Sequence, residues 1–150
     1  MKKASRGFTL IEILIVIGII AILAAIVIVA INPAKQFAQA RNTQRESNVN
    51  TILNAIGQNM ADNKGIFDCN NEDEDIDNVG SANAIGTTDI DLASCLVPEY
   101  IPAMPFDPEN GDRVDTEYTI QVDSVGRFTV CAPNGNEAAI PGSAAICVTR

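Results

Sequence analysis

An unbroken apolar run close to the start of the chain is the strongest pattern in the sequence. Residues 8–31 are almost wholly apolar, and the last 19 of them, residues 13–31, include no polar side chain. As a helix these residues extend about 28 Å, close to the thickness of the hydrocarbon core of a bilayer. The run is therefore predicted to be helical, because a single segment in lipid must satisfy its own backbone hydrogen bonds.

The pattern changes at Asn32 and Pro33. A proline removes one backbone donor and clashes with the preceding turn, so a kink is predicted near residues 29–33, with a full break of the helix as the alternative. Beyond it, a second helical segment is predicted over residues 34–63. Lys64 and Gly65 are typical of the end of a helix.

The second helical segment carries one apolar stripe at helical spacing. Its members are Val49, Ile52, Leu53, Ile56 and Met60. We interpret this stripe as the face that packs against the rest of the domain. The polar residues on the same segment are interpreted as its exposed surface: Arg41, Gln44, Arg45, Asn48 and Asn50.

Alternation of apolar and polar residues predicts three strands, at 117–122, 127–132 and 145–149. Residues 123–126, between the first two, predict a hairpin turn. The expected fold class is therefore α+β, with a long N-terminal helix whose second half packs on a small antiparallel β-sheet.

Residues 66–100 are irregular and polar, and they include an acidic tract. Asp73, Asp75 and Asp77 have the spacing that opens an EF-hand calcium loop. Asn78 and Ala84 stand where that loop requires glycine and glutamate, so we interpret the tract as a solvated acidic loop.

The charge of the chain differs between its start and the remainder. The 150 residues carry 10 Lys and Arg against 19 Asp and Glu, a net charge of −9. Removal of the first seven residues, with Lys2, Lys3 and Arg6, leaves 7 cations against 19 acids, a net of −12. Such an acidic domain has no basic footprint for nucleic acid. Histidine, the commonest general base, is absent from the sequence, and no enzyme is predicted.

All four cysteines follow the apolar run: Cys69, Cys95, Cys131 and Cys147. An even number in a small exported domain favours two disulfides, and three connectivities are possible. Cys131 and Cys147 point away from the apolar faces of their predicted strands, which allows a bridge between them if the strands are neighbours. Cys69 and Cys95 bracket the acidic region, and a bridge there would stabilise the fold by roughly 3 kcal/mol.

Three interpretations of the N-terminus compete. A secretory signal peptide has an apolar region of about 7–15 residues, shorter than this run. A plain membrane anchor accounts for the length but not for Glu12, because a charge within a membrane helix costs about 2.5–3.5 kcal/mol. The third interpretation rests on the segment Gly-Phe-Thr-Leu-Ile-Glu at 7–12, behind the basic residues. This segment resembles the class III leader of type IV pilins and of type II secretion pseudopilins.

The resemblance implies how the chain is processed. A membrane peptidase would cut after Gly7 and methylate the new amine of Phe8. Residues 1–7 would then be the leader peptide, 8–33 the transmembrane and polymerisation helix, and 34–150 the globular head. The role implied for Glu12 is to pair with the N-terminal amine of a neighbouring subunit during assembly.

The resemblance also implies the function of a structural subunit of a type IV pilus-like filament, without catalysis. The implied partners are further copies of the chain, minor pilins, the prepilin peptidase/N-methyltransferase and the inner-membrane assembly platform. The protein is expected in the cytoplasmic membrane before assembly and in a cell-surface pilus or extracytoplasmic filament afterwards. Two alternatives remain: a pseudopilin of a type II secretion system and a membrane-anchored binding protein with an acidic ligand loop.

The C-terminal region between Cys131 and Cys147 resembles the disulfide-bounded end of many pilins. With this bridge assigned, Cys69–Cys95 completes the pairing that we favour.

Residues 96–108 resemble a segment of the major pseudopilins, in which a calcium site lies in the following loops. The candidate calcium ligands are Asp107, Glu109, Asp112 and Asp115. The glycine-rich, doubly acidic segment of that family is missing, so a solvated loop is the alternative. No other cofactor is expected.

Overall fold

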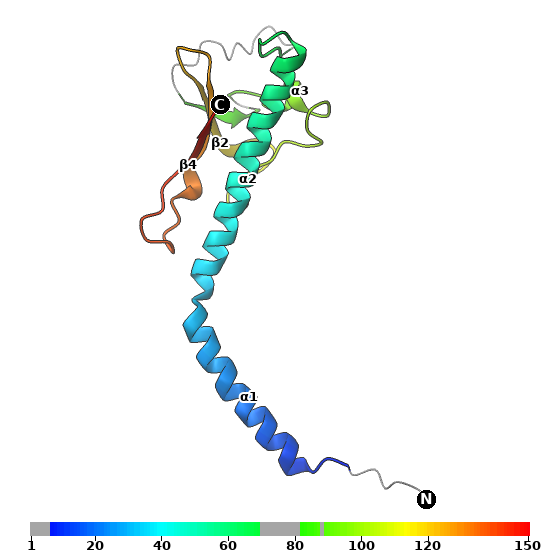
Figure 1. Ribbon diagram of the computed structural model, residues 1–150, viewed down its shortest axis with the longest axis vertical. Helices are drawn as coiled ribbons and strands as arrows, with labels where there is room; N and C mark the ends of the chain where they lie inside the picture. Colours follow the sequence, from blue (N-terminus) through cyan, green and yellow to red (C-terminus); the bar gives the residue numbers. More distant parts are fainter. Residues whose placement is uncertain (1–6, 70–81, 88) are drawn as a thin grey trace, which may run out of the picture. The chain divides into compact units, whose positions relative to one another are not determined.

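The computed structural model describes residues 7–69, 82–87 and 89–150. The chain divides into two compact units, Met1–Gln36 and Phe37–Arg150, and each is described by itself (Figure 1). The acidic tract with Asp73, Asp75 and Asp77 lies outside the described residues.

The first unit is built around helix α1, Leu10–Ile31, and ends in the first turn of helix α2, Pro33–Asp62. Between the two helices Asn32 has a left-handed backbone, with φ of 47°. Asparagine tolerates this conformation better than most residues. The carbonyl of Asn32 accepts the backbone N–H of Lys35, and Pro33 stands at the first helical position, where its missing donor is harmless. The apolar run therefore ends in a full break rather than a kink.

The second unit is the predicted α+β domain, and its apolar stripe is confirmed. Val49, Ile52, Leu53 and Ile56 of α2 are buried, and Met60 packs against them. Helix α2 ends where Lys64 and Gly65 adopt positive φ and the Gly65 N–H donates to the Met60 carbonyl. The interpretation of the remaining polar residues was wrong for two of them. Arg45 and Asn48 are buried, because carboxylates and a tyrosine from distant segments meet them.

A four-stranded antiparallel sheet in the order β1-β2-β3-β4 covers the stripe. The strands are β1, Asn83–Gly86; β2, Asp115–Val122; β3, Phe128–Ala132; and β4, Ile146–Thr149. Tyr118, Ile120 and Val130 on one face of the sheet are fully buried against α2. Strand β1 and the short helix α3, Leu92–Leu96, arise within the segment that we expected to be irregular.

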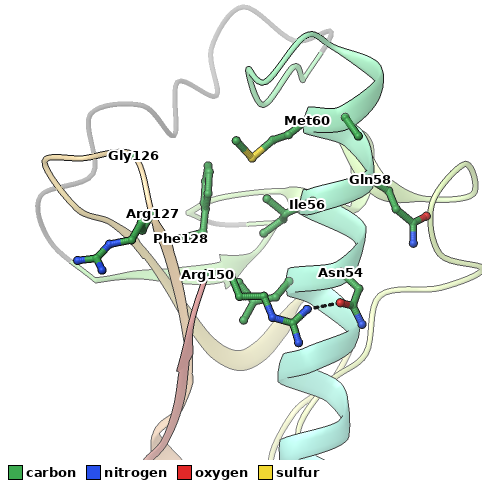
Figure 2. A pocket seen from close by; sticks show the side chains of 11 residues that line it. Asn54, Ile56, Gln58, Met60, Gly126, Arg127, Phe128 and Arg150 are labelled. Atoms are coloured by element: carbon green, nitrogen blue, oxygen red, sulfur yellow. Dashed lines mark hydrogen bonds between the residues drawn. The ribbon is translucent and has the colours of Figure 1, made fainter.

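The end of β4 is tied to α2 by side chains. Arg150, directly after β4, donates to the side-chain carbonyl of Asn54 (Figure 2) and to that of Asn50. The predicted hairpin turn lies at the same end of the sheet, where the Asp123 carboxylate accepts the backbone N–H groups of Val125 and Arg127.

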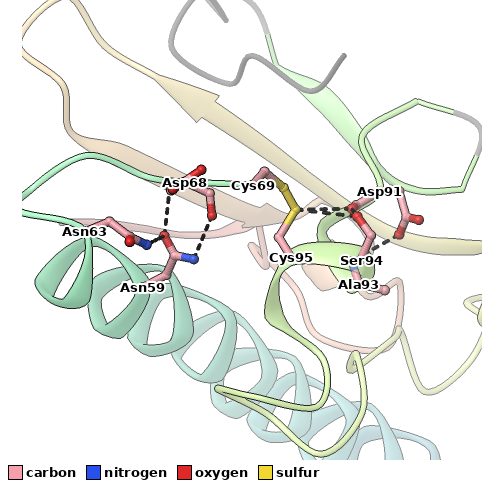
Figure 3. Close-up of a disulfide and its surroundings, with 8 residues drawn as sticks. All are labelled: Asn59, Asn63, Asp68, Cys69, Asp91, Ala93, Ser94 and Cys95. Carbon is pink, nitrogen blue, oxygen red and sulfur yellow. Dashed lines mark hydrogen bonds between the residues drawn. A yellow bond between two sulfur atoms is a disulfide. The ribbon is translucent and has the colours of Figure 1, made fainter. Parts of the chain in front are cut away.

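Two disulfides join the segments of the second unit. Cys131 and Cys147 face each other in the β3–β4 register, with their Cα atoms 4.1 Å apart. Cys69 and Cys95 are bonded with a Cα–Cα distance of 4.9 Å, which holds the chain beyond α2 against α3 (Figure 3). Beside this bridge, the amide of Asn59 both donates to and accepts from the backbone of Asp68. The two disulfides, Cys131–Cys147 and Cys69–Cys95, are the pairing that the sequence analysis favoured.

Candidate assembly site

The segment before α1 leaves the predicted cleavage position open. Gly7, Phe8 and Thr9 precede the first helical residue, and Phe8 is 85% exposed. An added Cβ at Gly7 would meet no atom within 4 Å. Non-helical, exposed backbone of this kind is what a peptidase requires for access to a peptide bond. The cleavage after Gly7 and the methylation of Phe8 stay predictions.

Glu12 is held at the start of α1 by a reciprocal capping arrangement with Thr9. The Glu12 carboxylate accepts from the Thr9 backbone N–H and from the Thr9 hydroxyl, both at 2.8 Å. The Thr9 hydroxyl in turn accepts the Glu12 backbone N–H at 3.3 Å. The acid therefore lies in the first helical turn, where the helix dipole favours negative charge, with two donors already on its Oε2 atom.

Thr9 is a partner of Glu12 that the sequence analysis did not predict. The predicted partner of Glu12 was the amine of Phe8 that cleavage would create. The signal for Thr9 was present, because Thr-x-x-Glu at the start of an apolar run is the pattern of a capping box.

The remainder of α1 presents apolar side chains on every side. Among the described residues, one helix, Leu10–Ile31, has the length and composition to cross a membrane, with a mean hydropathy of 3.5. None of its residues is buried within the described part of the chain. A helix that is apolar all round needs lipid or other helices to cover it.

In the head, a buried ion cluster links α2 to two loops. The Arg45 guanidinium donates from Nε to Asp107 at 2.6 Å and from Nη1 to Glu137 at 2.5 Å. Arg41, one helical turn earlier, makes two hydrogen bonds to Glu137, at 2.6 and 2.5 Å. Asp107 lies in the loop before β2 and Glu137 in the loop before β4. The cluster of Arg41, Arg45, Asp107 and Glu137 therefore fixes both loops to one face of α2.

The charged forms of this cluster are strongly favoured. The hydrogen bonds from Arg41 are the main cause that lowers the pKa of Glu137 to about 2, with Arg45 adding to them against the effect of burial. For Asp107, burial favours the neutral acid. The bonds from Arg45 and from two backbone N–H groups outweigh burial and lower the pKa of Asp107. Burial would lower the pKa of Arg45, but its two carboxylate partners raise it.

The four candidate calcium ligands have separate partners in the structure. Asp107 is paired with Arg45, and Glu109 lies 3.4 Å from Arg41. Asp112 and Asp115 accept backbone N–H groups of the turn that enters β2. Among the described residues, no three Asp, Glu, His or Cys side chains gather in a way that could hold a metal ion. Calcium binding stays a prediction, which titration calorimetry of the purified chain with calcium would test.

Comparison with known proteins places the N-terminus in a defined motif. The sequence profile of the family described as "Prokaryotic N-terminal methylation motif" matches residues 2–28. Two relatives called "Type IV major fimbrial protein FimA", one from Dichelobacter nodosus strain VCS1703A and one from Dichelobacter nodosus, are 33% identical to the chain over 124 residues. The aligned region covers 79% of this chain and 69% of each relative. No solved structure matches the chain.

Proposed function

This chain belongs to the type IV pilin family, and on that premise we propose that it is a structural subunit of a pilus, polymerised through α1 after removal of a leader that ends at Gly7. The observation that supports the proposal most strongly is helix α1 itself. It is exposed and apolar except for a single acid in its first turn, and it overlaps the methylation motif of residues 2–28. Lipid covers α1 before assembly and the equivalent helices of other copies cover it afterwards. The same apolar surface serves in both places.

Cleavage changes the charge at the start of α1. The leader carries Lys2, Lys3 and Arg6, which favour the cytoplasmic side of the membrane, and they leave together with it. The new amine of Phe8 is the only cation that remains near Glu12 in the sequence. In a staggered array of helices, Glu12 of one subunit accepts the amine of the next, which offsets part of the desolvation of both charges.

Thr9 has a role in the pairing of Glu12 with the amine of the next subunit. Before assembly, its N–H and hydroxyl occupy the Glu12 carboxylate, so that the acid is not left without donors in the membrane. The incoming amine then adds to these donors or replaces the hydroxyl. Thr9 thereby lowers the energy of the membrane-inserted precursor without removing the preference of Glu12 for a full positive charge.

The head, with a net charge of −11 over residues 34–150, forms the solvated surface of the filament and carries no catalysis. Its partners are copies of itself, minor pilins, the prepilin peptidase and the assembly platform in the cytoplasmic membrane. Of the two assembly systems considered, the pilus is favoured over the secretion pseudopilus, because the relatives are fimbrial proteins.

Mass spectrometry of filaments sheared from cells that produce the chain tests the proposal. The expected result is a subunit that begins at a methylated Phe8.

The variant Glu12→Ala should be inserted and cleaved but give few filaments, whereas Thr9→Ser, which keeps the hydroxyl, should assemble normally. A subunit that keeps Met1 and stays dispersed in the membrane would support an anchored binding protein instead. Normal filament yield from Glu12→Ala would remove the assembly role of this residue alone.

A further inference from the structure

A groove of about 520 Å³ opens on the head between the C-terminal half of α2 and the adjoining ends of β3 and β4 (Figure 2). Its apolar floor is formed by the core residues Leu53, Ile56 and Phe128, which are 3%, 1% and 5% exposed, and the partly buried Met60 lies in its wall. Gly57 lies in the same wall, and a Cβ added there would meet no atom within 4 Å. A helical glycine costs about 1 kcal/mol relative to alanine, and here it leaves the groove wall without a side chain.

Two arginines stand at the edge of this groove. Arg127 is paired with Asp123 at 2.7 Å, within its own turn. Arg150 donates to the neutral amides of Asn54 and Asn50, and among the described residues it forms no ion pair with an Asp or Glu side chain. In a head with a large excess of acids, an apolar groove beside such a cation favours an acidic segment that also carries apolar side chains.

The head itself presents a segment of this kind. The loop 106–115, which precedes β2, exposes 43% of Phe106 and 53% of Val114. The loop also carries Glu109, which is 47% exposed and 3.4 Å from Arg41, and the exposed acids Asp112 and Asp115 against one exposed cation, Arg113. The loop therefore keeps an excess of acids beside its apolar side chains, which complements the groove in hydrophobicity and charge.

The loop is held by hydrogen bonds within its own head. The backbone N–H of Asp107 donates to the Thr116 carbonyl at 3.0 Å, and that of Asp112 donates to the Asp115 carbonyl at 2.8 Å. The Asp107 side chain is buried and paired with Arg45. Docking therefore requires little ordering of the loop, which removes one of the main costs of association.

The loop and the groove lie at opposite ends of β2. The strand begins at Asp115, where the loop ends, and leads at Val122 into the turn whose Gly126 lines the groove. Eight residues of strand separate the two features by about 23 Å. Contact between two different patches at opposite ends of one subunit is heterologous, the kind of contact that builds an open filament wherever its rotation does not close into a ring.

We propose that the loop 106–115 of one copy docks into the groove lined by Leu53, Ile56, Met60 and Phe128 of the next copy. The proposal rests on the proposed function, because only an assembled filament presents copies in a repeating array. It assigns a specific head-to-head contact in addition to the packing of the apolar helices.

Filling the groove is the first test. Gly57→Leu places a side chain in the groove and raises helix propensity, so the head should stay folded. Thr51→Leu, at an exposed position of α2 outside the groove, is the matched control. We expect the yield of sheared filaments to fall about tenfold for Gly57→Leu, the equivalent of losing one apolar contact, and to stay at the wild-type level for Thr51→Leu. Equal yields from both variants would overturn the proposal.

Cross-linking in assembled filaments is the second test. The double variant Gly57→Cys, Val114→Cys should give a ladder of dimers, trimers and longer species on a non-reducing gel after mild oxidation, with positions 57 and 114 joined in the cross-linked peptide. Each single variant should give dimers at most. The pair Gly57→Cys, Val125→Cys, with both positions at the groove end of the head, should give no ladder.

The outcomes distinguish failure of the loop–groove contact from failure of the proposed pilus function. Filaments that form but show no 57–114 ladder overturn the docking and leave the pilus function standing. If the wild-type chain forms no filaments, the proposed function fails and the docking fails with it.

Discussion

Replacing Arg45 by methionine should destabilise the head more than any exposed charge change. Arg45 is 0% exposed and bonds two carboxylates, one of which, Asp107, is 1% exposed. Methionine keeps much of the apolar stem but leaves these acids without their shared cation. Breaking a buried ion pair from one side costs about 3–5 kcal/mol, because an uncompensated charge stays in the interior.

Urea unfolding of the full chain in a non-ionic detergent, with both disulfides intact, measures this loss. With a slope of about 2 kcal/mol per molar urea, a loss of 3–5 kcal/mol lowers the midpoint at pH 7 by about 1.5–2.5 M. The matched control is Arg127→Met, which removes an exposed i,i+4 pair with Asp123 and should cost under about 1 kcal/mol.

Two further measurements distinguish buried charge from lost packing. Asp107→Asn, added to Arg45→Met, removes the stranded charge while keeping an oxygen acceptor, and should recover at least half of the loss, because Glu137 keeps its two bonds from Arg41. For Arg45→Met alone, the deficit relative to wild type should shrink below about pH 4, because the stranded Asp107 becomes protonated. A deficit under about 1 kcal/mol at pH 7, or one that is unchanged by Asp107→Asn, refutes the electrostatic explanation.

Three more predictions follow from the same domain. Because the pKa of Glu137 is lowered from 4.5 to about 2, its contribution of roughly 3 kcal/mol should be present above pH 4.5 and be lost as the pH falls toward 2. Urea midpoints measured against pH should therefore be flatter for Glu137→Gln. Gly111→Ala should cost about 2 kcal/mol or more in the same assay, since the new Cβ would lie 2.5 Å from the backbone nitrogen of Asp107. Removing the bridge with Cys131→Ala and Cys147→Ala, which opens a 16-residue separation, should lower the stability by about 3 kcal/mol.

Hydrophobic periodicity predicts a helix or strand only where the element is long enough for its pattern of apolar and polar residues to repeat. Helix α2 shows its stripe over three turns, and β2 alternates buried and exposed residues along its length, so both were located to within two residues. Strand β1 has four residues with no alternation, and α3 has five. Each depends on tertiary partners: β1 on its pairing with β2, and α3 on the Cys69–Cys95 bridge. No local pattern predicts such elements.

Arg45 shows why the buried ion cluster could not be predicted. Charged residues on a helix are nearly always solvated, so the sequence favours exposure. Its burial depends on Asp107 and Glu137, 62 and 92 positions away along the chain. Asp107 was predicted only as a candidate calcium ligand, and no role was predicted for Glu137. The Thr9–Glu12 cap is the opposite case, because its whole signal lies within four residues.

The ion cluster is better explained by the orientation of loops than by stability. Well-packed apolar residues in place of a buried ion pair are often neutral or stabilising, so stability alone does not require Arg45. An apolar side chain at position 107 would lose the oxygen that accepts the backbone N–H groups of Glu109 and Asn110. The carboxylate that pairs with α2 therefore also fixes the turn that presents Phe106 and Val114 at the surface. A subunit that must repeat one contact along a filament needs this fixed geometry, since an error in one loop would recur at every copy.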